Sequence, residues 1–157
     1  VSQKLLDESI DVMSTLNETA SRLMVSIGVN AATDVTGFGL IGHLKNMMIQ
    51  SKVSAKIMTS SVPIIDGVLE LIDRGFVPGG TNRNLEDSTG NVEWSNELSL
   101  REKLLLSDSQ TSGGLLISVP EHNADALLEE LHSSNVKVAA TIGEVYGSTK
   151  PGVQVIP

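Results

Sequence analysis

The stretch Thr33-Asp34-Val35-Thr36-Gly37-Phe38-Gly39, which continues as Leu40-Ile41-Gly42-His43-Leu44, decides how this chain is expected to fold. Ahead of it, Ala31 and Ala32 are small apolar residues of the kind that can end a buried strand. Behind it, apolar residues recur at the three- and four-residue steps of a helix, namely Leu40, Ile41, Leu44, Met47 and Met48. The stretch is therefore predicted to be the turn between a strand and a helix.

A turn of this kind offers places for an anion and for a metal ion. Gly37 and Gly39 carry no side chain, so their backbone N–H groups can approach an anion closely. The first turn of a helix leaves N–H groups unpaired, and the helix dipole adds partial positive charge there. The carboxylate of Asp34 offers the oxygen ligands that a hard cation prefers. The alternative is ordinary fold geometry, with Asp34 as the N-cap of the helix.

Three stretches together resemble a known family. Thr33–Leu44, TDVTGFGLIGHL, is similar to the hallmark of selenophosphate synthetases, also called selenide, water dikinases. Ser107–Pro120, SDSQTSGGLLISVP, resembles a glycine-bearing segment that these enzymes share with the wider aminoimidazole ribonucleotide synthetase superfamily. Val77–Leu85, VPGGTNRNL, resembles the loop between the two motifs. The order and spacing of the motifs agree from about Leu16 to Glu144.

The resemblance implies an activity and a division of labour. Selenophosphate synthetases use selenide, ATP and water to make selenophosphate, AMP and phosphate, with Mg²⁺ as cofactor. The family has two domains, and residues 1–157 resemble only the C-terminal one, so the reactive Cys or selenocysteine, an essential Lys and the other metal-binding aspartates are expected outside this chain. No catalytic residue is expected within it. Asp34 is the magnesium ligand that the resemblance carries over, and the intact enzyme is implied to be a homodimer through its N-terminal domains.

Five further residues are candidates for contact with phosphate: Thr33, Thr36, Gly37, Gly39 and Arg83. The two threonine hydroxyls could orient Asp34 or meet a phosphate, or could make only local turn hydrogen bonds. Arg83 lies in a glycine-hinged segment that could close over phosphate, or it could pair with Glu86 or Asp87 on the surface.

Two other features have both a functional and a structural interpretation. Asp108–Gly114 could form an anion-binding nest or a structural turn against the Asp34 loop. Family members commonly have Pro where this chain has Ser109, a departure that touches no residue assigned to chemistry. His43 is expected to be a partly buried, hydrogen-bonded histidine rather than a metal ligand.

Composition limits the classes of function. The net charge of −8 argues against sequence-independent binding to nucleic acid or to an anionic membrane. The absence of cysteine excludes disulfides and thiolate zinc sites in this chain, and no apolar run approaches the roughly 20 residues of a membrane span. A cytoplasmic location is expected. Val1, in place of a start methionine, suggests a piece of a longer protein.

Periodicity predicts an α+β fold, with a mixed β-sheet packed with helices. Helices are expected at Leu5–Ile27, as one helix or as two end to end, and at Gly39–Gln50, Pro63–Arg74, Leu98–Leu106 and Glu121–Ser133. Strands are expected at Val29–Val35, Val53–Ile57, Leu115–Val119, Val136–Ile142 and Val153–Ile156. The segment Phe76–Asn96 has almost no periodicity and is predicted to be a mobile loop.

Two other hypotheses remain beside the selenophosphate synthetase. One is another ATP-dependent enzyme of the same superfamily, from purine or thiamine biosynthesis or hydrogenase maturation, against which Phe38 in TGFG and the following GHL argue. The other is a non-catalytic domain that binds a nucleotide or a partner.

Overall fold

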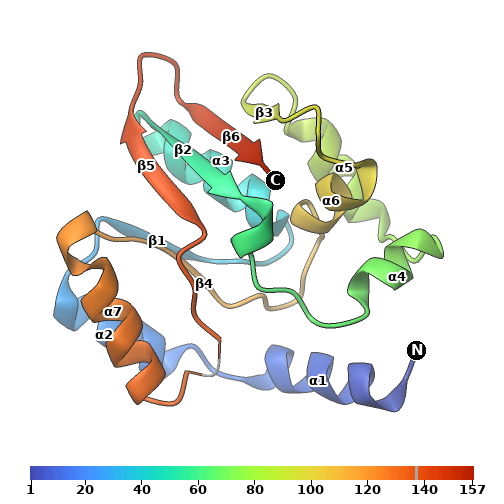
Figure 1. Cartoon of the computed structure of the whole chain (residues 1–157), viewed down its shortest axis with the longest axis horizontal. Coiled ribbons are helices and arrows are strands. Elements are labelled where there is room, and N and C mark those ends of the chain that lie inside the picture. The colour runs from blue at the N-terminus through green and yellow to red at the C-terminus, as the bar shows by residue number, and fades with distance from the viewer. Residues whose placement is uncertain (137) are drawn as a thin grey trace.

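The computed structural model describes residues 1–136 and 138–157 as an α+β fold with two sheets and helices around them (Figure 1). The larger sheet has four strands in the order β3-β6-β2-β5, and the smaller has the two strands β1 and β4. Because the larger sheet contains both parallel and antiparallel pairs, it is mixed. The predicted fold class is confirmed.

Strand pairing fixes the segment that precedes the glycine-rich turn, because this segment is hydrogen-bonded to a neighbouring strand. In the larger sheet β2 (Val53–Met58) runs parallel to β6 (Gly152–Ile156) and antiparallel to β5 (Gly143–Gly147), and β3 (Val92–Trp94) extends it beyond β6. In the smaller sheet β1 (Ala31–Asp34) is antiparallel to β4 (Leu115–Ser118), with Asp34 opposite Leu115.

Seven α-helices and one 3₁₀ turn are described in residues 1–136 and 138–157. They are α1 (Gln3–Ser14), α2 (Glu18–Ile27), α3 (Gly39–Ser51), the 3₁₀ turn Thr59–Ser61, α4 (Val68–Asp73), α5 (Gly79–Asp87), α6 (Leu100–Leu106) and α7 (Glu121–Ser133). In the described part of the chain, none of the helices has both the length and the apolar character needed to cross a bilayer.

The strongly periodic segments form the elements predicted for them. Leu5–Ile27 is two helices, which separate at Thr15–Asn17, and Gly28 ends the second one with φ +90°. The predicted helix at Gly39–Gln50 is confirmed as α3. The first strand is shorter than predicted, because only Ala31–Asp34 pairs with β4.

Three predictions are wrong in whole or in part. Within Pro63–Arg74 only Val68–Asp73 is helical, because Gly67 has a left-handed backbone with φ +88° and the helix starts after it. Phe76–Asn96 is not one loop, since it contains α5 and β3. The strand predicted at Val136–Ile142 includes Lys137, which lies outside the described residues. The residues described on either side of it are not strand, and β5 begins only at Gly143.

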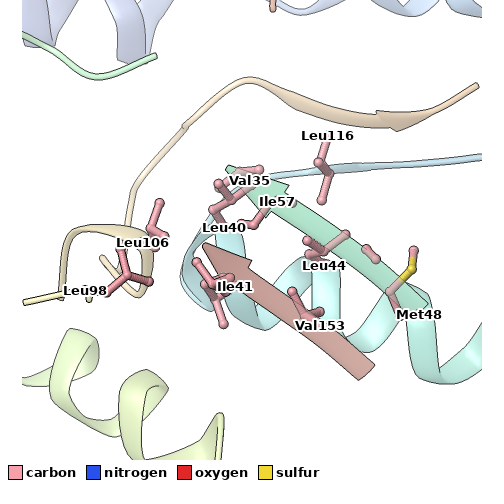
Figure 2. Packing of buried hydrophobic residues seen from close by; sticks show 12 residues of the cluster. Val35, Leu40, Ile41, Leu44, Met48, Ile57, Leu98, Leu106, Leu116 and Val153 are labelled. Atoms are coloured by element: carbon pink, nitrogen blue, oxygen red, sulfur yellow. The ribbon is translucent and has the colours of Figure 1, made fainter. Parts of the chain in front are cut away.

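The main hydrophobic core lies between α3 and the four-stranded sheet. Figure 2 shows Ile41 and Leu44 of α3 beside Val153 of β6, with Leu98 and Leu106 at one end of the cluster. Val35, in the turn after β1, and Leu116, in β4, join the same core. The turn is therefore anchored in the core by the residue that directly follows Asp34.

A second cluster lies where α2 packs against α7 (Figure 1). Its buried residues are Leu23, Leu127 and Leu131, and Ile117 and Val119 pack against it from β4 and the residue after it. The two-stranded sheet thus lies between the two clusters.

Candidate functional site

The turn after β1 is joined to the glycine-bearing loop before β4 by backbone hydrogen bonds. The Val35 N–H donates to the Gly114 carbonyl at 2.9 Å, and the Gly113 N–H donates to the Val35 carbonyl at 2.8 Å. One residue further, the Gln110 N–H donates to the Thr36 carbonyl at 3.1 Å. Two of the three stretches that carry the family resemblance are therefore side by side.

The third stretch reaches the same place through α5. The Thr81 hydroxyl donates to Asp108 Oδ1 at 2.9 Å and accepts a hydrogen bond from the Ser109 N–H at 3.2 Å. Thr81 is only 1% exposed. Burial raises the pKa of the Asp108 carboxyl above its ordinary value, and the hydrogen bonds from Thr81 and the Ser109 N–H oppose that rise. The loop at Asp108–Gly114 thus packs against both α5 and the Asp34 loop.

Asn84 and Gly39 bring these segments into close contact. The Asn84 side-chain amide donates to the carbonyls of Gly37 at 2.9 Å and Ser107 at 3.0 Å. Gly39 has φ +68°, and a Cβ placed on it would stand 2.7 Å from the Ser107 carbonyl carbon and 2.8 Å from the Asp108 carbonyl oxygen. The close approach of a neighbouring backbone thus favours glycine at position 39.

Asp34 is exposed at the end of β1. Its carboxylate has no hydrogen-bond or ion-pair partner among the described residues, and it lines an open hollow that also includes Glu18 at the start of α2. Phe38, not Asp34, is the N-cap of α3, so the interpretation of Asp34 as a helix cap is wrong.

These residues fit a magnesium ion only in part. In residues 1–136 and 138–157 no group of three or more His, Cys, Asp or Glu side chains could hold a metal. Magnesium, however, keeps several of its waters and usually takes only one or two carboxylates together with substrate phosphates. One unpaired carboxylate, Asp34, can therefore be one ligand of such an ion, but not the whole site.

The candidate phosphate contacts differ in whether their polar groups are already hydrogen-bonded within the chain. The Thr33 hydroxyl makes a local bond to the Asp34 carbonyl at 3.2 Å, and the Thr36 N–H donates to His43 Nε2 at 3.0 Å. The Gly39 N–H donates to the Thr36 carbonyl at 3.0 Å, whereas Gly37 is exposed. The turn therefore uses most of its own polar groups internally.

Arg83 is exposed on α5, and in the described part of the chain it makes no ion pair with Glu86 or Asp87. Its Nη1 lies 3.6 Å from where a Cβ on Gly79 would stand, so the guanidinium folds back over the start of α5. Asp34 instead faces the hollow beside Glu18. Among the described residues, no ion pair joins Arg83 to Asp34.

Sequence reasoning missed the residues that connect the three stretches. Thr81, Asn84 and Asp108 carry no periodic or metal-binding pattern, and Thr81 and Asn84 lie in a segment that was predicted to be a loop. The sequence signal for this contact was the occurrence of all three stretches in one chain. It indicates that the stretches meet, but it does not show which side chains connect them.

The fold and this site define a small α+β domain whose glycine-rich loops converge beside one exposed carboxylate. A family model described as AIR synthase related protein, C-terminal domain, matches residues 7–156, and the chain belongs to this family. The superfamily predicted from the motifs is confirmed.

Among curated proteins, the chain is 42% identical over 139 residues to a selenide, water dikinase of Carboxydothermus hydrogenoformans, covering 88% of this chain and 40% of that protein. It is 41% identical over 157 residues to a selenide, water dikinase of Myxococcus xanthus, covering 99% of this chain and 44% of that protein. The chain thus spans about two fifths of the length of these relatives.

Among solved structures, the hydrogenase maturation protein HypE has a TM-score of 0.58 at 20% identity, over 85% of this chain and 34% of that chain. This likeness shows the fold alone.

Proposed function

We propose that this chain is the C-terminal domain of a selenophosphate synthetase, the enzyme that makes selenophosphate, AMP and phosphate from selenide, ATP and water. The observation that carries the proposal is the 41% identity over 157 residues, with 99% of this chain covered, to a protein named selenide, water dikinase. The solved structure of HypE is only 20% identical to this chain, so it supports the fold and not the activity of HypE.

In this proposal Asp34 is one ligand of a magnesium ion that carries the phosphates of ATP. Bound Mg²⁺ supplies neutralisation of the phosphate charge, which phosphoryl transfer needs more than covalent help. The exposure of Asp34 and its lack of a partner among the described residues support this role. Since one carboxylate is not a complete site, the remaining ligands come from phosphate, water and the N-terminal domain.

Phosphate contacts are proposed for Arg83 and the backbone at Gly37, which are exposed. Contacts through Thr33, Thr36 or Gly39 would require the hydrogen bonds within the turn to exchange. These three residues would then act mainly by giving the turn its shape.

We also propose that the catalytic groups of the whole protein lie in its N-terminal domain, that the intact enzyme is a cytoplasmic homodimer, and that this chain alone is inactive. Phosphorus NMR of the chain with ATP, Mg²⁺ and selenide under anaerobic reducing conditions tests the last point. A selenophosphate signal from the chain alone would contradict it.

A chimera tests the function itself. This chain would replace the matching two fifths of the Carboxydothermus hydrogenoformans selenide, water dikinase, and selenophosphate formation would be followed by phosphorus NMR. The chimera should be active. A folded but inactive chimera would count against the proposed function and favour a domain that binds a nucleotide or partner without catalysis.

The same chimera tests Asp34. We expect Asp34→Asn to lower the rate at limiting Mg²⁺ by at least about tenfold, because even the loss of an outer-shell partner of a metal ligand typically costs about 10- to 100-fold. More Mg²⁺ should restore part of the rate. The control is Asp125→Asn, on the exposed face of α7, which removes the same charge away from the site. Equal rates in the two variants would contradict the assignment.

A further inference from the structure

The imidazole of His43 is hydrogen-bonded to the turn that follows Asp34. His43 lies on α3 and is half-buried, and its Nε2 is 3.0 Å from the Thr36 backbone nitrogen and 3.2 Å from the Thr36 hydroxyl oxygen. A backbone N–H can only donate, so Nε2 must be the acceptor. The ring is therefore neutral with its proton on Nδ1 when this bond is formed.

Phe38 holds the imidazole in this orientation. Its ring packs edge-on against His43, with 5.5 Å between the ring centroids and an angle of 64° between the planes. A Cβ on Gly42 would stand only 2.8 Å from the Phe38 Cβ, so the missing side chain at position 42 lets Phe38 reach the imidazole. This contact gives a physical reason for the order Phe38, Gly42, His43 in the stretch.

The bond to His43 completes the hydrogen bonding of Thr36. The Thr36 carbonyl accepts from the N–H groups of Gly39 at 3.0 Å and Gln110 at 3.1 Å. The Thr36 N–H has His43 Nε2 as its acceptor. Without that acceptor a half-buried donor would lose its bond within the chain, which is costly.

We propose that His43 is a positioning residue, whose unprotonated Nε2 fixes the backbone at Thr36 and thereby the direction in which Asp34 presents its carboxylate. His43 touches neither metal nor substrate in this role. The part of the inference that concerns Asp34 rests on the proposed function, whereas the bond to Thr36 does not.

The tautomer is tested directly on this 157-residue chain. Nitrogen-15 NMR of the imidazole at pH 8 should show a protonated Nδ1 and an unprotonated Nε2, the latter resonating far downfield. A protonated Nε2 would overturn the proposal, because it could not accept from the Thr36 N–H. This measurement needs no variant and no activity.

Two variants test whether the acceptor matters. His43→Leu fills the position with an apolar side chain that has no hydrogen-bond acceptor. In His43→Gln the side-chain amide oxygen can accept in place of Nε2. Hydrogen exchange of the Thr36 amide should be about tenfold faster in the Leu variant, and near wild type in the Gln variant, as expected for one hydrogen bond. The Val35 amide, which donates to Gly114, is the internal control. Equal Thr36 exchange in the Leu variant and the wild type would overturn the proposal.

The chimera then separates this inference from the proposed function. In an active chimera, His43→Leu should raise the Mg²⁺ concentration that gives half the maximal rate, and His43→Gln should restore it. An unchanged Mg²⁺ dependence, together with faster Thr36 exchange, would refute the link to Asp34. An inactive chimera would count against the proposed function only, because NMR decides the bond to Thr36 by itself.

Discussion

At the scale of single residues, Gly39 is the position where two backbones approach most closely around the turn. We predict that Gly39→Ala destabilises the protein by about 3 kcal/mol, from a left-handed backbone that costs roughly 1–2 kcal/mol and an overlap with Ser107 and Asp108 that costs about 1–3 kcal/mol. Urea unfolding measures the loss.

The control for Gly39 is Gly75→Ala. Gly75 has a similar backbone, with φ +81°, but its Cβ would meet nothing within 4 Å. We expect only the backbone cost there, about 1–2 kcal/mol. If the two variants lost equal stability, the close approach at Gly39 would have no energetic consequence.

Asp108 provides a pH-dependent prediction. Burial raises its pKa above the ordinary value of 3.8, so its ionised form is less favourable in the folded protein than in the unfolded one. This penalty is complete above the folded pKa and disappears as pH falls through that value toward 3.8. We therefore expect Asp108→Asn to be more stable than wild type at pH 7, with the difference shrinking as the pH is lowered.

The comparison is made by urea unfolding at a series of pH values from 7 downward. Asp125→Asn, on the exposed face of α7, reports the general effect of removing one negative charge from a chain of net charge −8. An Asp108→Asn variant whose advantage grew on acidification would contradict the expected sign.

At the scale of elements, the start of α6 depends on a capping box. Ser99 Oγ accepts from the Glu102 N–H, and Glu102 Oε2 accepts from the Ser99 N–H at 2.7 Å. Hydrogen bonds from Ser99 lower the pKa of the Glu102 carboxyl. We predict that Ser99→Ala costs about 1 kcal/mol at pH 7, the usual loss for an N-cap serine.

The cost of Ser99→Ala should fall in acid. Because the folded pKa of Glu102 is lowered, its contribution is present above the unfolded value of 4.5 and is lost as pH falls through the folded value. Thermal unfolding of wild type and variant at pH 7 and pH 3 measures this change. A constant difference at both pH values would show that the carboxylate does not take part in the cap.

Elements could be predicted where one face is apolar and the ends carry clear signals. In α3 the apolar spacing and the preceding glycines were sufficient, and Gly28 marked the end of α2. In α5 they were not, because Gly79, Gly80 and the asparagines are poor helix formers and Leu85 is its one apolar residue. Tertiary hydrogen bonds from Thr81 and Asn84 hold that helix, and local sequence carries no such information.

The candidate site, like the helices and strands, could be predicted from the sequence only in part. Motifs indicated that Asp34 and the two glycine-bearing loops belong together, and Val35, Gly113 and Gly114 form the bonds that join them. The acceptor at His43 could not be found from sequence, because the bond depends on how α3 is oriented against the turn that precedes it.

At the scale of the whole molecule, β1 and β4 lie between two hydrophobic clusters. Leu116 of β4 joins the core around α3, whereas Ile117, the next residue, packs against the α2 and α7 cluster. Since neighbouring residues of a strand point to opposite faces, this short sheet is packed on both sides. The support of Asp34 therefore depends on both clusters.

Weakening one cluster or the other should have different effects on the stability of the rest of the molecule. Ile41→Ala and Leu127→Ala each remove a buried side chain, 1% and 4% exposed respectively, and each should cost about 2–5 kcal/mol. Native-state hydrogen exchange distinguishes them, because it measures local as well as global opening. We expect Ile41→Ala to lower the protection of all slowly exchanging amides, since α3 and both sheets contact that core.

Leu127→Ala should instead act locally. The amides of α2 and α7 should lose most of their protection, whereas those of α3 and β2 stay near wild type, because Leu127 belongs to the smaller cluster. If both variants lowered all amides equally, the two clusters would form one cooperative unit. In the expected case α2, which contributes Glu18 to the Asp34 hollow, can open while α3 and the turn that precedes it stay folded, because the turn is anchored through Val35 in the larger cluster.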